Sequence, residues 1–509
     1  MADVSCLFDK DNKLKIKISK YLDKNITVLN ALFANCADVA QKTILLERAE
    51  GNTRIHIIYI DGLVDVQQVE DSVVKPLIYE WRDRYTKDVW TSIMYKEAHT
   101  VEIKREPSFD KAVNSVLKGD TAIFIDGYYD AMVVSTKKLP LRSIGENDKE
   151  AGMRGPRDSF NEGFRSGTAL IRRRIRDVRL KVEQGNIGQR SKTDYAIMYM
   201  EDIASPNLVR EIKKRIEKYD IDGIFDSGMA EHLMEDNWYS PFPMFQSTTR
   251  PDKVASGLVE GRVAVVFDNS PEVIMAPNNL NMLLQASDDY YNRWAVGTFA
   301  RILRYIAAFL AITFPGLYIA VTVFHSEMLP TKLLYAIASA RTMVTFPIVV
   351  EMLIMEFLFE LLREAGIRLP GPLGNTIGVV GGLIVGQSAV EAGIVSTIVV
   401  IVVALSAIAS FAIPNEEFAS VFRLLKFFII LTSALMGLYG FILGLIVIAI
   451  HLSNLESFGV PYMMPIAGDI KENKAGKRDF VIRSPLKALR YRPLWSRAGN
   501  RVRLKRKEK

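Results

Sequence analysis

The distribution of apolar residues changes abruptly near residue 300. Before this point, short apolar runs of strand length alternate with amphipathic helical segments, as in a soluble α/β protein. After it, four stretches contain no Asp, Glu, Lys or Arg: Tyr305–Phe324, Pro370–Val390, Gly393–Ile413 and Phe427–Ile450. Each has about 20 residues or more, which is enough to cross a hydrocarbon core of about 30 Å. The pattern predicts an α/β soluble region of two lobes followed by an α-helical polytopic membrane domain.

The two lobes are predicted from an internal repeat. Residues 107–136 and 249–276 align at a constant offset of 142, and each segment reads as a helix, a glycine, an apolar β-run, an Asp-led turn and a second β-run. The offset aligns Asp110 with Asp252, Lys111 with Lys253, Gly119 with Gly261 and Asp126 with Asp268. Two related α/β lobes are the economical interpretation, and two unrelated helix–hairpins are the alternative.

The remaining pattern gives further elements and the domain limits. We expect strands at 54–60 and 195–200 and helices at 69–81 and 207–219. The predicted domains are a variable N-terminal segment (1–40), a first lobe with a linker (41–150), a second lobe (151–295), a transmembrane domain (296–460) and a basic tail (461–509). The predicted spans lie at about 303–324, 373–391, 394–413 and 427–450.

One apolar segment in the membrane half is interrupted by acidic residues. Residues 342–363 contain Glu351, Glu356 and Glu360, and the segment ends at Arg363. A carboxylate at mid-membrane is costly, so we expect a re-entrant or interfacial segment, or one that faces a water-filled space. These four residues are therefore candidates for an ion vestibule or an interface. Their alternative role is that of an ordinary charged helix surface with a snorkelling arginine.

Charge fixes the expected orientation. Four crossings place the N-terminal region and the tail on the same side of the membrane. From residue 468 onward the tail carries 15 Lys or Arg and 4 Asp or Glu. So close to a membrane span, this excess favours the cytosolic side and contact with anionic lipid over nucleic acid.

The sequence carries no recognisable catalytic or metal-binding motif. It has no Walker loop, no GxGxxG after a strand and no CxxC, and its five histidines are scattered. Cys6 and Cys36 do not indicate a disulfide framework. We therefore expect neither an enzyme nor a bound metal or cofactor.

The second uncharged stretch is the strongest candidate for function. Glycine recurs every four residues, which lets helix backbones approach closely: Gly374, Gly378, Gly382 and Gly386. On a helix, the opposite face has polar residues at its ends and apolar residues at its waist: Thr376, Val380, Leu383, Gln387 and Glu391. Several copies in a ring would form a pore with its constriction at Val380 and Leu383. A glycine-rich helix buried in a monomeric bundle is the alternative.

A polar segment immediately precedes the first span. Asp288, Asp289, Arg293 and Trp294 lie there, together with two tyrosines. Trp294 and the tyrosines fit an interfacial anchor. The alternative is a coupling joint that transmits motion from the soluble lobe to the span.

Several long segments resemble the A-subunit family of bacterial spore germinant receptors, the GerA type. The quoted matches are SPFPMFQSTTRPDKVASGLVEGRVAVVFDNSPEVIMAP (240–277), SDDYYNRW (287–294), ELLREAGIRLPGPLGNTIGVVGGLIVGQSAVEAGIVS (360–396) and SFGVPY (457–462). The resemblance covers about residues 155–462 and, loosely, the first lobe.

The resemblance implies a subunit of a nutrient-sensing receptor in the inner spore membrane, with both termini in the cytosol. It implies a transporter-like B subunit and a lipoprotein C subunit as partners, and a homo-oligomeric, ligand-gated cation channel that starts germination. A non-conducting scaffold or accessory subunit is the alternative, and a secondary transporter is a further one. The spans show no clear internal repeat of the kind typical of such transporters.

Overall fold

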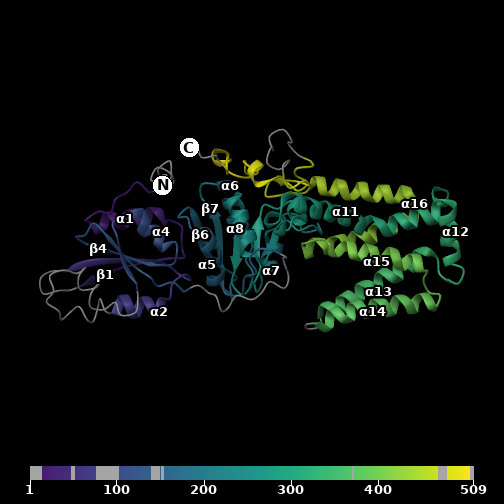
Figure 1. Cartoon of the computed structure of the whole chain (residues 1–509), viewed down its shortest axis with the longest axis horizontal. Helices are drawn as coiled ribbons and strands as arrows, with labels where there is room; N and C mark the ends of the chain where they lie inside the picture. The colour runs from purple at the N-terminus through teal and green to yellow at the C-terminus, as the bar shows by residue number, and fades with distance from the viewer. Residues whose placement is uncertain are drawn as a thin grey trace. The chain divides into compact units, whose positions relative to one another are not determined.

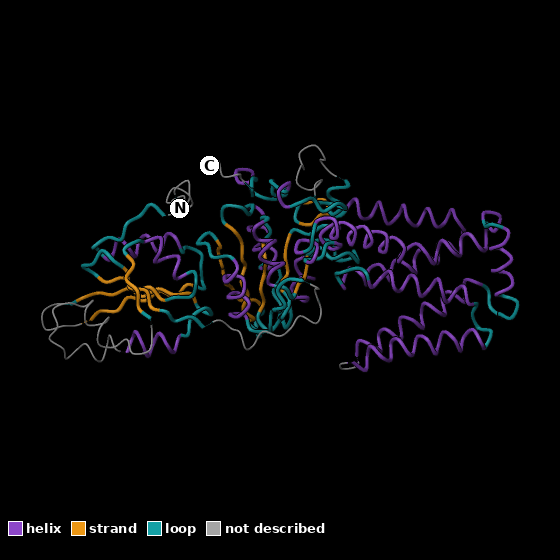
Figure 2. Tube along the Cα trace, in the orientation of Figure 1, coloured by secondary structure: helices purple, strands orange, loops and turns teal. Residues whose placement is uncertain are grey.

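The computed structural model describes residues 8, 14–46, 52–75, 102–138, 150, 154–368, 372–467 and 479–504. The chain forms two compact units. The first contains residues 1–238, 244–277 and 489–509, and the second contains residues 239–243 and 278–488. Figure 2 shows the strands gathered in sheets and the second unit built mainly of helices. The predicted fold class is confirmed: an α/β region with two sheets precedes a helical region with long apolar helices.

The first lobe is a five-stranded antiparallel sheet in the order β1-β2-β4-β5-β3. Its elements are α1 (Leu22–Leu32), β1 (Val39–Leu46), β2 (Thr53–Ile60), α2 (Val66–Val69), a π-helical turn (Glu70–Val74), β3 (Ile103–Glu106), α4 (Phe109–Val116), β4 (Thr121–Ile125) and β5 (Ala131–Val134). Alternate residues of β4 enter different cores because successive side chains of a strand point to opposite faces. Phe124 packs on one face with α1 and α4, and Ile123 packs on the other with Val69 of α2.

The second lobe repeats this arrangement, with strand order β6-β7-β9-β10-β8. Its elements are α5 (Phe164–Arg174), β6 (Leu180–Ile187), β7 (Thr193–Met200), α6 (Pro206–Ile216), α7 (Ser227–Met234), β8 (Gln246–Thr248), α8 (Pro251–Val259), β9 (Val263–Phe267) and β10 (Val273–Ala276). In Figure 1, α5 and α8 lie beside the strands of this lobe. Both helices contribute to the main core of the lobe, since Leu170 and Leu258 are buried there with Val266 of β9.

The internal repeat is present in the fold and extends beyond the segments that sequence reasoning aligned. The helix–hairpin of the second lobe begins and ends 142 residues after that of the first. The same offset relates α1 to α5. The aligned aspartates make equivalent hydrogen bonds in the two lobes. Asp126 Oδ1 accepts a hydrogen bond from the backbone N of Leu22 at 3.1 Å, and Asp268 Oδ1 accepts one from the backbone N of Phe164 at 3.2 Å. Each carboxylate thus stabilises the N-terminus of a helix distant in sequence.

The N-terminal boundary differs from the expected one. A limit at residue 40 falls inside β1, and α1 belongs to the first lobe because Leu22, Leu29 and Leu32 are fully buried in its core. The segment between α1 and β1 also reaches the second lobe. There the backbone of Cys36 forms an isolated parallel β-bridge with that of Val182 in β6. Burial raises the pKa of the Cys36 thiol, so the thiol stays protonated at neutral pH.

Other predicted elements are found close to their expected positions. The strands at 54–60 and 195–200 correspond to β2 and β7, and the helix at 207–219 corresponds to α6. The helix expected at 69–81 begins in α2 and the turn that follows it; residues 76–81 lie outside the described part. Most of the expected linker also lies outside it, as do Cys6 and residues 468–478 and 505–509 of the tail.

The second unit consists of helices joined by short connections. Its elements are α9 (Leu280–Leu284), α10 (Asp288–Tyr291), α11 (Trp294–Ile319), a π-helical turn (Ala320–Phe324), a 3₁₀ turn (Ser326–Met328), α12 (Thr331–Ala340), α13 (Ile348–Arg368), α14 (Pro372–Glu391), α15 (Thr397–Phe411), α16 (Glu416–Asn454), β11 (Glu456–Ser457), β12 (Val460–Pro461) and a 3₁₀ turn (Leu486–Ala488). Within the described chain, the segments Trp294–Phe324 and Glu416–Asn454 are long and apolar enough to cross a membrane.

The helix α16 is folded back on itself, whereas the sequence pattern predicts a single span at about 427–450. Gly437 has φ 60° and ψ −138°, which interrupts the helix. The aromatic ring of Phe242 lies 6.2 Å from that of Phe418, near the start of α16, and 5.9 Å from that of His451, near its end. Two residues separated by 33 positions in a straight helix would lie about 50 Å apart. The two arms of α16 are therefore antiparallel.

The segment expected to be re-entrant or interfacial is a continuous helix. The 21 residues of α13 span about 31 Å, which matches the thickness of a hydrocarbon core. Its buried residues recur at helical spacing, so one face of α13 lies against the helical core.

Part of the basic tail is ordered against other segments of the first unit. The backbone N of Arg497 donates to the carbonyl of Ile203 at 2.7 Å, and Arg503 pairs with Glu260 at 3.2 Å. A second 3₁₀ turn follows at Ala498–Asn500. The basic composition of this part of the tail thus serves, in part, contacts within the protein.

Candidate functional site in the helical unit

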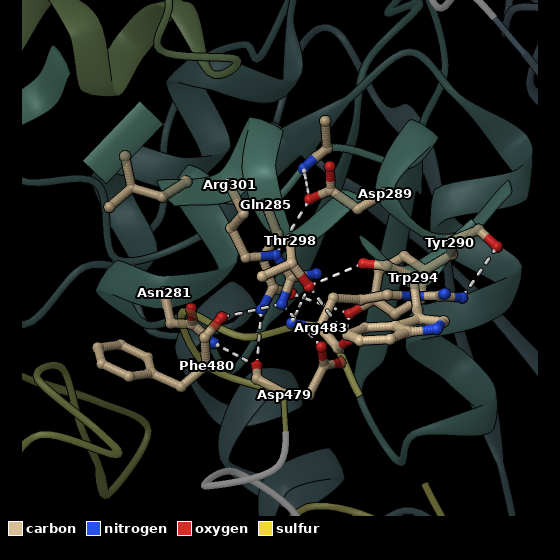
Figure 3. Close-up of polar contacts among 12 residues, drawn as sticks. Asn281, Gln285, Asp289, Tyr290, Trp294, Thr298, Arg301, Asp479, Phe480 and Arg483 are labelled. Carbon is tan, nitrogen blue, oxygen red and sulfur yellow. Dashed lines mark hydrogen bonds and ion pairs between the residues drawn. The ribbon is translucent and has the colours of Figure 1, made fainter. Parts of the chain in front are cut away.

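A cluster of charged side chains surrounds the start of α11 (Figure 3). Asp289 of α10 is 1% exposed and accepts hydrogen bonds from Arg301 Nε at 3.2 Å and from Arg304 Nη2 at 2.6 Å. Arg301 is also fully buried, and its Nη1 donates to Asp479 Oδ1 at 2.7 Å. Two carboxylates therefore compensate two arginines that the helix carries into an apolar environment. We call Asp289, Arg301, Arg304 and Asp479 the joint cluster.

The joint cluster ties the C-terminal segment to the start of the first long helix. Tyr290 Oη donates to Asp479 Oδ2 at 2.5 Å, and Gln285 Nε2 donates to the Asp479 carbonyl at 2.9 Å. Arg483 continues the contact, because its backbone N donates to Thr298 Oγ1 at 3.2 Å. Side chains of α11 and its preceding segment thus hold both side-chain and backbone groups of residues 479–483 (Figure 3).

Sequence reasoning identified only part of this cluster. Of the four residues suggested as a coupling joint, Asp289 lies at its centre. Asp288 is half-buried, Arg293 is exposed at the N-terminus of α11, and Trp294 is 50% exposed. The partners Arg301, Arg304 and Asp479 were missed. The spacing of Arg301 and Arg304 at i and i+3 at the start of an apolar helix was the available signal.

Two acidic residues of α13, which the sequence suggested as part of an ion vestibule or an interface, are buried in ion pairs. Glu351 is fully buried; it pairs with Arg341 at 3.1 Å and accepts from the backbone N of Ser396 at 2.7 Å. Glu356 is also fully buried; it pairs with Lys426 of α16 and accepts from Ser406 Oγ of α15 at 3.2 Å. Neither carboxylate faces solvent in this conformation, so neither lines an aqueous vestibule here.

The other two residues of that predicted group are paired as well. Glu360 lies 3.6 Å from Arg423, and Arg363 lies 3.5 Å from Glu416, both on α16. Sequence reasoning missed these basic and acidic partners because the two residues of each pair are more than 50 positions apart in the chain.

The glycine ladder lies on α14, as the sequence pattern predicts. Among the described residues, no atom lies within 4 Å of a Cβ built on Gly382, whereas one built on Gly386 would meet Val400 of α15 at 3.5 Å. The ladder is therefore open at Gly382 and covered at Gly386. The side chains of Thr376, Val380 and Leu383 lie outside the described part, as do the surroundings of Gly374 and Gly378.

The polar end of α14 is exposed. Gln387 and Glu391 both face outward, and Gln387 Nε2 donates to Glu391 Oε1 at 2.9 Å. This i,i+4 pair gives the helix a polar patch that no other described helix covers. Within the described residues, no group of three or more His, Cys, Asp or Glu side chains is arranged to hold a metal ion.

Comparison with known proteins places the chain in a family. The sequence profile described as "Bacillus/Clostridium GerA spore germination protein" matches residues 27–495. The chain is 40% identical to spore germination protein KA of Bacillus subtilis over 95% of this chain and 88% of that protein. It is 40% identical to spore germination protein A1 of the same organism over 85% of this chain and 88% of that protein. It is 30% identical to stage V sporulation protein AF, also from B. subtilis, over 88% and 90%.

One solved structure is also similar. It is described as the crystal structure of the N-terminal domain of the A subunit of the Bacillus megaterium spore germinant receptor GerK3. The identity is 28% and the TM-score is 0.41, over 52% of this chain and 96% of that chain. On the extent of the family match and the identity to its relatives, this chain belongs to the GerA family of spore germination proteins.

Proposed function

We propose that this chain is the A subunit of a nutrient-sensing germinant receptor of the inner spore membrane, and that it oligomerises through α14 into a gated cation channel. The family membership supports the role in germination. The uncovered Gly382 and the exposed polar pair of α14 support the oligomeric channel.

The exposed face of α14 is the observation that carries this proposal. A membrane helix that leaves Gly382 uncovered and presents Gln387 and Glu391 outward has no tight partner at that glycine and exposes polar groups nearby. Glycine at helix spacing permits close approach by another helix, and exposed polar groups in a bilayer require water or protein around them. A ring of copies meeting at α14 satisfies both needs, with the polar pairs facing a central aqueous path.

The helical unit suits a multi-pass arrangement. In this proposal α11, α13, α14, α15 and the two arms of α16 cross the bilayer. The buried ion pairs of Glu351 and Glu356 offset much of the cost of placing carboxylates in a crossing helix. An even number of crossings keeps both termini in the cytosol, where the basic tail also faces anionic lipid.

The proposed receptor contains partner subunits. By resemblance to the family, these are a transporter-like B subunit and a lipoprotein C subunit, with nutrient recognised mainly by the B subunit. Nutrient binding would then favour the open ring over the closed one, which requires different affinities for the two states.

Cation flux through the purified protein in liposomes tests the channel. Wild-type protein should conduct monovalent cations, Gly382→Leu should abolish the flux by separating the copies, and Val380→Ala should increase it by widening the constriction. Ala404→Leu is a matched control, because it enlarges a small exposed residue on α15. It should leave the flux unchanged.

A scaffold function is distinguished in the same assay. Wild-type protein that stays silent when reconstituted with the B and C subunits, while its oligomers remain intact, would contradict the channel. That result would favour a non-conducting organiser of the receptor.

A further inference from the structure

Three ion pairs connect α13 with the first arm of α16. Glu356 pairs with Lys426, Glu360 lies 3.6 Å from Arg423, and Arg363 lies 3.5 Å from Glu416. Lys426 also lies 3.9 Å from Glu360, so the first two pairs share a cation. We call these six residues the charge zipper: Glu356, Glu360, Arg363, Glu416, Arg423 and Lys426.

The order of the pairs is that of two antiparallel helices. Moving along α13 from Glu356 to Arg363, the partners on α16 run backward from Lys426 to Glu416. The α13 residues are spaced by four and three positions, so they share one face of the helix. The zipper is therefore an ordered series of charged side chains that links one face of α13 to the first arm of α16.

The zipper is buried most deeply at one end. Glu356 is fully buried and Lys426 is 3% exposed, whereas the side chains of Glu360 and Glu416 are 27% and 68% exposed. Burying charges is costly, and apolar residues of similar size commonly stabilise such an interface as well or better. Charged partners do, however, define one register, because a shifted pairing leaves a buried charge without its counter-ion.

The position of α13 determines that of α14. Only residues 369–371 separate the two helices, and a Cβ built on Gly381 of α14 would meet Leu362 of α13 at 3.2 Å. On the covered side, α14 meets α15 at Gly386 and Val400. Whatever sets the register of α13 against α16 therefore also sets where the glycine ladder and its polar end lie.

We propose that the charge zipper positions the α13–α14 pair, so that Glu356, Glu360 and Arg363 act as positioning residues for the pore helix. This inference rests on the proposed function for its effect on ion flux, although the positional effect stands by itself. The zipper holds α14 in its resting register, and loss of one pair releases α14 from that register.

Disulfide cross-linking between α14 and α15 tests the position directly. In a background with Cys6→Ser and Cys36→Ser, the pair Gly386→Cys and Val400→Cys should cross-link efficiently, given their proximity. Adding Glu360→Arg, which places a cation opposite Arg423 and Lys426, should remove most of the cross-link. Adding Arg423→Glu as well restores opposite charges and should restore it.

The matched control is Glu364→Arg. Glu364 lies on the same helix, pairs with Arg368 outside the zipper and undergoes the same change of charge. It should keep the wild-type cross-link. If the Glu360→Arg protein does not fold, Glu360→Gln replaces it in the test, because it removes the charge and keeps the shape of the side chain. It should also weaken the cross-link.

The outcomes separate this inference from the channel. A cross-link that Glu360→Arg and Glu360→Gln leave unchanged overturns the inference, as does a double exchange that fails to restore it. In liposomes, the single reversal should change the basal cation flux, and the double exchange should return it to the wild-type value. If the cross-links follow the expected pattern but no variant conducts cations, the positioning role of the zipper stands and the channel is contradicted.

Discussion

At the scale of single residues, buried and partly buried arginines form ion pairs with aspartates that lie elsewhere in the chain. The arginine-rich run after residue 170 gives no sign in sequence of where each side chain points. In the structure, Arg172 is buried at the contact between the lobes, where its Nε donates to Asp38 Oδ2 at 2.7 Å. Arg174 of the same helix pairs instead with Asp158 at 2.6 Å. Two arginines of the same helix thus pair with different aspartates, and the sequence alone does not show which aspartate each one contacts.

The buried pair makes a testable contribution to stability. Arg172→Met leaves Asp38, itself 1% exposed, without its counter-ion. Breaking a buried pair in this way should lower the free energy of unfolding by about 3–5 kcal/mol. Thermal or denaturant unfolding of the purified protein measures the change.

The control for this substitution is Arg176→Met. Arg176 is exposed at the end of the same segment, so its removal should change stability by less than about 0.5 kcal/mol. Equal effects at the two positions would show that Arg172 contributes only as a surface residue does.

At the scale of elements, local patterns predicted the elements of the lobes well and those of the helical unit less well. The helix–hairpin repeat was readable because Gly119 and Gly261 end the helices with φ of 94° and 93°, and the apolar runs that follow have strand length. The fold of α16 was missed because residues 427–450 are apolar throughout, so hydropathy alone shows no turn. Gly437, Gly440 and Gly444 were the available signal, since glycine permits a sharp turn and close approach of the arms.

The turn in α16 depends on one glycine. Gly437 has φ of 60° and ψ of −138°, and a Cβ at this position would lie 2.8 Å from Cβ of Phe324. Gly437→Ala should destabilise the helical unit by about 1–3 kcal/mol, because an L-residue is strained in this conformation. The midpoint of thermal unfolding in detergent, followed by tryptophan fluorescence, measures the effect.

Gly499→Ala provides the comparison for that substitution. Among the described residues, no atom lies within 4 Å of a Cβ at this position, and its φ is not positive. Its unfolding midpoint should therefore stay near that of the wild type. An unchanged midpoint for Gly437→Ala would contradict the turn at this residue.

At the scale of the whole molecule, long-range contacts decide what sequence reasoning left open. The carboxylates of α13 looked out of place in an apolar helix until their partners were known: Arg341 for Glu351, and Lys426 and Arg423 of α16 for Glu356 and Glu360. Likewise, Asp479 follows Arg301 by almost 180 positions, so no local pattern joins them in the joint cluster. The general plan of α/β lobes, long apolar helices and a glycine ladder could be read from the sequence, whereas the pairing of distant charges required the fold.

The channel proposal depends on copies of the chain meeting at α14. Cysteine cross-linking in native membranes tests this most directly, with Cys6→Ser and Cys36→Ser as the background. Gln387→Cys lies on the exposed polar end of α14, and Ile408→Cys, on α15, replaces a residue that is 65% exposed. We predict that Gln387→Cys forms disulfide-linked dimers on oxidation, because each chain then has one cysteine, while Ile408→Cys remains monomeric. A monomeric Gln387→Cys, or equal cross-linking at both positions, would contradict an assembly through α14.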